Sequence, residues 1–101
     1  MDASSYVHRL TGKVFKLLPM KDEELLGENV YLNVYLGSLR KEIAGAMQTF
    51  PVLADDFDYV TVANTANYIA ENAIAPADFS REVRKMLRLL NNVEARGDRD
   101  A

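Results

Sequence analysis

Apolar residues recur every three or four positions along most of the chain, which is the period of an α-helix. In the longest such run, residues 30–50, one face carries Leu32, Leu36, Leu39, Ile43, Met47 and Phe50. The first third of this run is apolar on nearly every side, because Asn33 is the one polar residue in 30–36. A helix that is apolar on all sides is buried on all sides, in a core or against a partner. We therefore predict a long helix at 30–50 around which the chain packs.

The first helix is expected over about residues 6–18. Ser4 or Ser5 is a suitable N-cap, because a short hydroxyl side chain can accept from the unpaired N–H groups of the first turn. Pro19 is expected to stop the helix, since proline disfavours the helical conformation in the residue before it. Residues 1–5 precede this helix and are expected to be disordered.

An acidic stretch at residues 20–29 separates the first helix from the long one. It predicts a surface loop, in which residues 22–26 have the composition for a single helical turn. Asn29 is a suitable N-cap for the long helix, and Pro51 is expected to end that helix near Phe50.

A third helix is expected over about residues 57–73, after a short connection at 51–55 and a cap at Asp55 or Asp56. One line along it is small and consists of Ala63, Ala66, Ala70 and Ala73. Such a line allows close approach of another helix, which favours the helical interpretation. The threonines and β-branched residues of this segment leave a strand at 59–62 as the competing interpretation.

The fourth helix is expected to begin at Asp78 or Ser80 and to reach about Val93. Its apolar face is the most regular in the chain and consists of Phe79, Val83, Met86, Leu87, Leu90 and Val93. The tail at 95–101 is polar and contains Gly97, so it is expected to be disordered.

Four helices that each carry one apolar face and are joined by short connections predict an all-α fold. The expected form is one domain over residues 1–101, a compact bundle of about four helices with the long second helix at its centre. Short connections favour antiparallel neighbours.

Composition narrows the classes of function. The chain has 101 residues, 49% of them hydrophobic and 27% charged, which is typical of a globular protein. It has no Cys, which excludes disulfides, thiolate catalysis and Cys-ligated metal sites and fits a reducing compartment. No apolar stretch is long enough to span a membrane or to serve as a secretory signal. We expect a cytoplasmic protein without a membrane partner.

Candidate chemistry is sparse. His8 is the one histidine of the chain, and at the edge of the first apolar face it fits packing better than catalysis. The carboxylates Asp55, Asp56 and Asp58 lack the later positions of a calcium loop, and a helix N-terminus explains them. The five glycines do not cluster as a phosphate loop does. We expect no metal, no cofactor and no enzymatic activity.

Gly37 and Gly45 fall inside the predicted long helix, where each lowers stability. Close approach of another helix is the predicted reason for both. Access of a partner or ligand to the backbone is the alternative.

The third helix also carries an unusual line of uncharged polar residues, and the second helix adds two tyrosines. Together these candidate interface residues are Tyr31, Tyr35, Thr61, Asn64, Thr65, Tyr68 and Asn72. Charged residues are depleted and Tyr is enriched at protein interfaces, whereas exposed helical surfaces usually carry many charges. The sequence leaves open whether this line is an interface or part of the core.

A basic face on the fourth helix is the one nucleic-acid signal. It consists of Arg81, Arg84, Lys85 and Arg88. Four cations over two turns can meet phosphates. The net charge of −3 and the lack of interleaved aromatic residues weigh against a surface built for nucleic acid.

No motif in the chain identifies a family. The pattern predicts a small non-enzymatic helical protein that acts through protein–protein interaction, with a partner protein or as a homo-oligomer such as a homodimer. The alternative is a nucleic-acid-associated accessory protein that uses the basic face.

Overall fold

The computed structural model describes the backbone of residues 2–20, 30–72 and 75–100, and the side chains of residues 2–18, 32–72 and 75–96. The described residues form four long helices, which are α1 (Ala3–Phe15), α3 (Val30–Thr49), α5 (Phe57–Glu71) and α6 (Pro76–Asp100). Two further helices of a single turn are α2 (Leu17–Met20) and α4 (Pro51–Ala54). The all-α fold is confirmed, with no strand in the described part of the chain.

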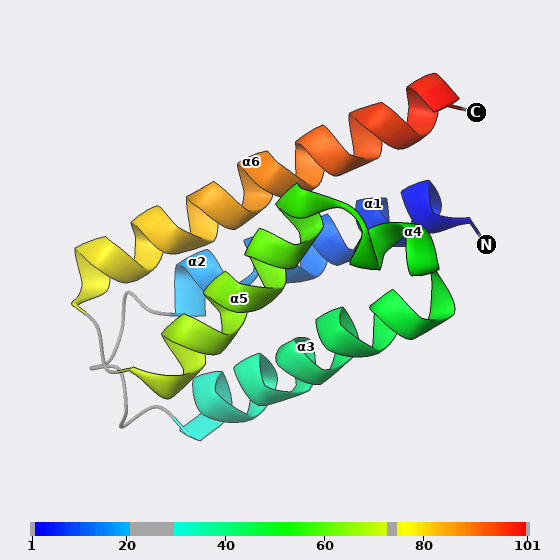
Figure 1. The fold of residues 1–101 in the computed structure, drawn as a ribbon. Helices are drawn as coiled ribbons and strands as arrows, with labels where there is room; N and C mark the ends of the chain where they lie inside the picture. Colours follow the sequence, from blue (N-terminus) through cyan, green and yellow to red (C-terminus); the bar gives the residue numbers. More distant parts are fainter. Residues whose placement is uncertain (1, 21–29, 73–74, 101) are drawn as a thin grey trace.

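The four long helices form an up-and-down bundle measuring 42 × 21 × 20 Å (Figure 1). Each runs antiparallel to the next in the chain, α6 lies along both α1 and α5, and α5 lies along α3. Long side chains join α1 to α3, because the Tyr6 hydroxyl donates to the Glu42 carbonyl and the Tyr35 hydroxyl to the Lys13 carbonyl. The prediction of a compact helical bundle is therefore confirmed.

One apolar core fills the bundle and takes side chains from all four long helices. Its buried members are Val7, Leu10, Val14, Leu17, Leu32, Leu36, Leu39, Ile43, Ala46, Leu53, Tyr59, Val62, Ala66, Ile69, Phe79, Val83, Met86, Leu90 and Val93. These residues recur at the predicted spacing of three and four, so each helix turns one face inward.

The predicted long helix at 30–50 is α3, but it forms one wall of the bundle. Val34 is 66% exposed, so the apolar start of α3 is not buried on every side. The longest helix is α6, with 25 residues against 20 in α3. All four long helices contribute buried side chains to the core, and none of them is surrounded by the other three.

Helix α1 begins earlier than predicted, at Ala3, because Asp2 rather than Ser4 or Ser5 is the N-cap. The Asp2 carboxylate accepts from the Ser5 N–H at 2.8 Å, and this hydrogen bond lowers the pKa of Asp2. At its other end α1 stops at Phe15, and Pro19 lies inside α2. Proline is tolerated in the first turn of a helix, where its missing N–H would have no acceptor within the helix.

The first connection lies largely outside the described residues. The predicted helical turn at 22–26 and the predicted Asn29 cap both fall there. The second connection, predicted at 51–55, contains the single turn of α4, with Pro51 at its start and Leu53 buried.

Helix α5 begins at the predicted cap. The Asp56 carboxylate accepts from the N–H groups of Asp58 at 2.9 Å and Tyr59 at 3.1 Å. The competing strand at 59–62 does not form, since a helical period places both Tyr59 and Val62 in the core.

Helix α6 is longer than predicted at both ends. It begins at Pro76, a residue type favoured at the first helical position, and continues to Asp100. The structure therefore places 95–100 in a helix, where disorder was expected, and likewise residues 3–5 in α1. Arg96, within this C-terminal extension, forms ion pairs with Asp56 and Asp58 at the start of α5, as described below.

Two tyrosine hydroxyls reach the interior side of α3. The Tyr59 hydroxyl, on α5, donates to the Ile43 carbonyl at 2.9 Å, and that of Tyr6, on α1, donates to the neighbouring Glu42 carbonyl at 3.4 Å. The Tyr6 ring also stacks on Phe50, with ring centroids 5.5 Å apart. Burial raises the pKa of Tyr59 well above its ordinary value, and the nearby Tyr6 hydroxyl adds to this effect.

This shift predicts a loss of stability in alkali. The folded state keeps the Tyr59 proton at a pH where the unfolded chain releases it, so the linked stability is complete below pH about 10 and falls above it. Above pH about 10, we expect the free energy of unfolding of Tyr59→Phe to fall less steeply with pH than that of the wild type. The two slopes should differ by up to about 1.4 kcal/mol per pH unit. Urea titrations between neutral pH and alkali measure both slopes.

Tyr68→Phe is the matched control, because it removes a hydroxyl from a half-exposed side chain. It should keep the wild-type slope. A Tyr59→Phe variant with the wild-type slope would contradict the assignment of the alkaline transition to Tyr59.

Candidate functional site

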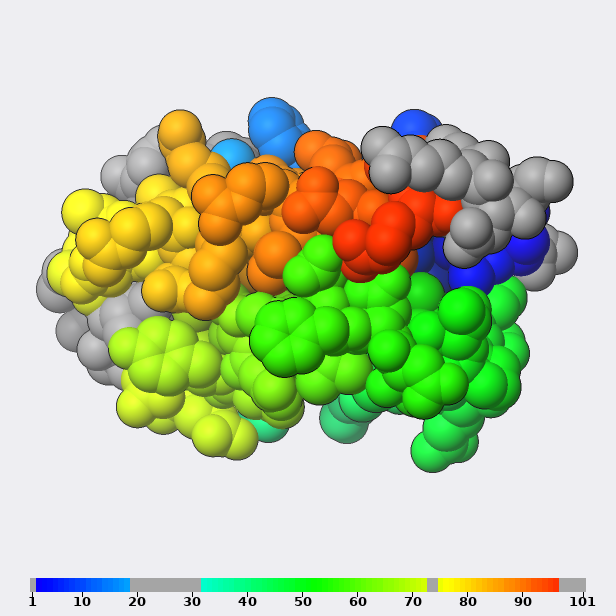
Figure 2. All heavy atoms as spheres, turned by 45° about the horizontal axis from the view of Figure 1, so that its top comes forward, coloured from blue at the N-terminus to red at the C-terminus, as the bar shows by residue number. Residues whose placement is uncertain are grey.

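The outer face of α5 carries four uncharged residues in a row, which we call the outer α5 stripe. They are Phe57, Thr61, Asn64 and Tyr68. Steps of four, three and four place them on one side of the helix, away from the core. Phe57 is 82% exposed and Tyr68 49% exposed. Figure 2 looks onto α5 and α6 side by side, with α5 in green and yellow-green along the lower part of the molecule.

The two threonines of α5 bond to their own backbone. The Thr61 hydroxyl donates to the Phe57 carbonyl at 2.9 Å, and the Thr65 hydroxyl donates to the Thr61 carbonyl at 2.8 Å. Because its hydroxyl is already bonded, Thr61 is a less polar member of the stripe than its residue type suggests. Thr65 is 5% exposed and belongs to the core, which is one of the two alternatives that the sequence left open for this line.

The remaining predicted interface residues are not part of the stripe, and one of them is the C-cap of α5. The Asn72 side chain donates to the Tyr68 carbonyl at 2.9 Å and so caps the C-terminus of α5. Tyr35 is half-buried where α3 meets α1, with its hydroxyl 2.7 Å from the Lys13 carbonyl. The side chain of Tyr31 lies outside the described part of the chain. Of the seven predicted residues, the structure brings together Thr61, Asn64 and Tyr68.

Phe57 is the stripe residue that the sequence analysis missed. It directly follows the Asp56 cap, and an apolar residue at a helix start is usually assigned to the core. Its position around the helix axis could have identified it from the sequence. Positions 57, 61, 64 and 68 share one side of the helix, while Tyr59 and Val62 lie on the opposite side.

Charges beside the stripe are paired within the chain. Arg40 of α3 donates to the Asn67 side chain at 2.9 Å and forms an ion pair with Glu71 at 3.1 Å. Val52 of α4 is also exposed, at 63%. The charges of Arg40 and Glu71 are therefore paired, whereas Asp55, two residues before Phe57, is exposed and has no ion pair among the described residues.

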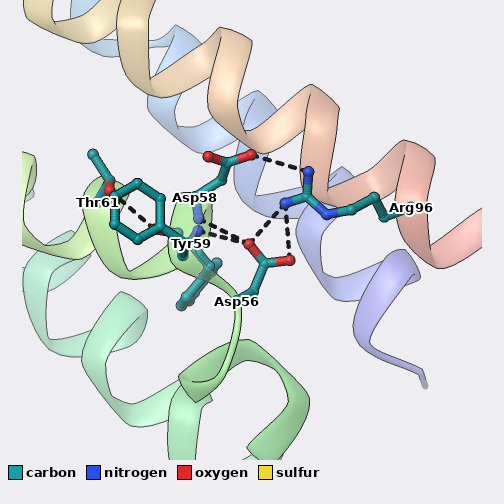
Figure 3. A network of polar contacts seen from close by, with 6 residues as sticks. Asp56, Asp58, Tyr59, Thr61 and Arg96 are labelled. Atoms are coloured by element: carbon teal, nitrogen blue, oxygen red, sulfur yellow. Dashed lines mark hydrogen bonds and ion pairs between the residues drawn. The ribbon is translucent and has the colours of Figure 1, made fainter.

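A second cluster joins the end of α6 to the start of α5 (Figure 3). The Arg96 guanidinium lies 2.7 and 2.9 Å from the two carboxylate oxygens of Asp56 and 3.0 Å from Asp58. The hydrogen bond to Asp56 raises the pKa of Arg96. These carboxylates thus serve a cap and an ion pair, and the described residues contain no group of three side chains arranged to hold a metal.

The basic face lies on the outer side of α6. Arg81 is paired with Asp78, and Lys85 is paired with Glu82 at 2.8 Å. Arg84 and Arg88 have no ion pair within the part of the chain that the structure describes. The four cations line a shallow groove of about 670 Å³ together with Ala77, Ser80 and the acidic Glu82.

A smaller groove of about 230 Å³ lies between α1 and α3. Its polar lining includes the ion pair of Lys13 and Glu42, whose charged atoms are 2.6 Å apart. The other carboxylate oxygen of Glu42 is buried and has no hydrogen-bond partner among the described residues. His8, on the outer side of α1, lies 2.8 Å from Glu94 of α6 and is largely exposed.

Gly37 and Gly45 have open space where a side chain would stand. A methyl group at either position would meet no atom of another described element within 4 Å. Close approach of another helix of the same chain, the predicted reason for both glycines, is therefore wrong. The alternative, that a partner or ligand needs access to this part of the α3 backbone, stays a prediction.

Comparison of the chain with protein-family models, with curated proteins and with solved structures finds no match. In the described part of the chain, no helix combines the length and the apolar character that crossing a membrane requires. The fold and these surfaces define a small all-α bundle with two separate candidate contact faces, the outer α5 stripe and the basic face of α6.

The cluster around Arg96 predicts a measurable coupling between α5 and α6. We expect Asp56→Ala to lower the free energy of unfolding by about 1–2 kcal/mol, because a cap and an ion pair are lost together. Arg96→Ala should cost less, on the order of 0.5–1 kcal/mol. The double variant should lose less unfolding free energy than the two single variants together, because the shared ion pair can be lost only once.

Asp55→Ala is the matched control for this cycle. It removes an exposed neighbouring carboxylate and should change stability by less than about 0.5 kcal/mol. Strict additivity of Asp56→Ala and Arg96→Ala would show that the ion pair contributes nothing to the bundle.

Proposed function

We propose that this chain is a non-enzymatic helical protein that acts by binding another protein through the outer α5 stripe. The observation that carries the proposal is the 82% exposure of Phe57 at one end of a stripe without charge. Burial of a Phe side chain is worth about 1.5–3 kcal/mol, so a partner that covers this ring gains a substantial part of its binding energy there. Aromatic residues and depleted charge are also typical of the centre of an interface.

The ionisable groups of the chain support a structural rather than a catalytic role for the polar residues. His8 is paired with Glu94, Lys13 with Glu42 and Arg96 with Asp56, and each pair joins two different helices.

Site-specific crosslinking tests the proposed surface in the source cell. We expect a photo-crosslinking amino acid at Asn64, in the middle of the stripe, to give covalent protein adducts that mass spectrometry can identify. Control chains carry the same amino acid at Arg84, on the outer side of α6, or at Phe15, which is exposed on α1, and should give few adducts. Phe57→Glu should reduce the adducts from position 64 by removing the apolar anchor.

Equal crosslinking from all three positions, or none from position 64, would contradict the proposed function. An adduct to a second copy of the chain and an adduct to a different protein both support it, and the mass of the adduct distinguishes them.

Binding of nucleic acid is the second candidate function. Arg84 and Arg88, without an ion pair in the described part of the chain, favour it, since both cations remain available for phosphates. Each phosphate contact changes log K by about −0.9 per unit of log salt concentration on duplex DNA. This function predicts that Arg84→Gln with Arg88→Gln lowers affinity and reduces the salt slope by roughly 2.

Arg81→Gln with Lys85→Gln is the matched control, because these two cations are already paired with Asp78 and Glu82. It should lower affinity less. Fluorescence anisotropy with labelled duplex DNA and RNA measures both variants, and a lack of binding at low salt would remove this function.

A further inference from the structure

We propose that the partner of the outer α5 stripe is a second copy of this chain, and that the two α5 helices pack antiparallel around a two-fold axis. This inference rests on the proposed function, because it requires the stripe to be the contact surface. It adds the identity of the partner and the register in which the two helices meet.

The order of residues along the stripe carries the inference. An aromatic residue, two small polar residues and a second aromatic residue follow one another at steps of four, three and four. Both the spacing and the chemistry read nearly the same in the two chain directions. A two-fold axis that passes between positions 62 and 63 therefore places Phe57 opposite the partner's Tyr68, and Thr61 opposite the partner's Asn64.

Each of these opposed pairs is chemically matched. Phe57 and the partner's Tyr68 form an aromatic pair, and symmetry makes this pair twice. The Asn64 amide has no hydrogen-bond partner within the described part of its own chain, so its donors and acceptor are available near the axis. A polar Asn in a helix–helix interface can fix register.

Charge also favours a second copy as the occupant. A surface that recognises an acidic or basic partner carries the opposite charge, and the stripe carries none. Of the charged residues nearest the stripe, Glu71 is paired with Arg40, and Asp58 shares Arg96 with Asp56. The antiparallel register opposes positions 58 and 67, so the two Asp58 carboxylates do not face each other, and the antiparallel direction also aligns the helix dipoles favourably.

The size of the contact predicts a weak dimer. A single pair of helices buries less than the roughly 800 Å² per partner of a standard stable interface. The fraction of dimer should therefore rise as the concentration of the chain rises, and dimer and monomer should exchange rapidly. Sedimentation equilibrium over a wide range of concentrations measures this directly.

A pair of charge variants tests the register. Phe57→Glu with Tyr68→Glu places like charges opposite each other across the axis and should abolish the dimer. Phe57→Glu with Tyr68→Lys places opposite charges there and should retain at least tenfold more dimer, with a difference that shrinks at high salt. Both side chains are exposed in the single chain, so both variants should keep the wild-type helicity and unfolding midpoint.

Phe15→Glu is the matched control, because it replaces an aromatic side chain of similar exposure on α1, at 60%. It should leave the association constant unchanged. Equal association of the two charge variants would overturn the antiparallel register, and a wild-type chain that stays monomeric up to roughly 1 mM would overturn the second copy as partner.

These results separate the inference from the proposed function. A monomeric chain whose position 64 crosslinks to a different protein would overturn the dimer and leave the proposed function standing. A chain that gives no adduct from position 64 and also stays monomeric up to roughly 1 mM would overturn both.

Discussion

Burial of one apolar face from each of four helices is the constraint on which the rest of the structure depends. A helix with a single apolar face cannot cover it alone, and four such helices can close around one another. The phase of each helix is fixed by this core, so the identity of its outward residues follows. Tyr59 and Val62 take the inner side of α5, and this places Phe57 and Tyr68 in solvent.

Polar contacts then join the helices at their ends and edges. Tyr59 and Tyr6 bind consecutive carbonyls of α3, and Arg96 binds the cap of α5. These contacts give each of these polar groups a structural partner. The outer α5 stripe differs from these contacts because it carries no charged side chain. Its exposed aromatic rings are the basis of the proposed interaction.

The sequence predicted the parts of the fold that depend on local chemistry. The period of three and four gave the four helices and their core faces, and the Asp56 cap and the span of α3 were confirmed. The end of α6 was missed, because a polar tail with Gly97 has no apolar pattern and the carboxylates that hold Arg96 lie forty residues earlier. Contacts of this kind depend on the tertiary arrangement.

The candidate site was only partly predictable for the same reason. A line of Asn, Thr and Tyr residues was visible in the sequence, but periodicity alone could not separate Thr65, which is buried, from Thr61, which faces outward. A sequence also does not show the hydrogen bond from the Thr61 hydroxyl to the Phe57 carbonyl, which makes the outer surface of Thr61 less polar. The phase of Phe57 agreed with the outward line, but its 82% exposure was known only from the structure.

The most direct test of the interaction surface is amide NMR of the labelled chain over a dilution series. If the outer α5 stripe is the surface that a second copy covers, the resonances of residues 57–68 will shift with concentration, while those of the basic face on α6 will stay in place. Shifts confined to α6, or spectra that do not change with concentration, would contradict it.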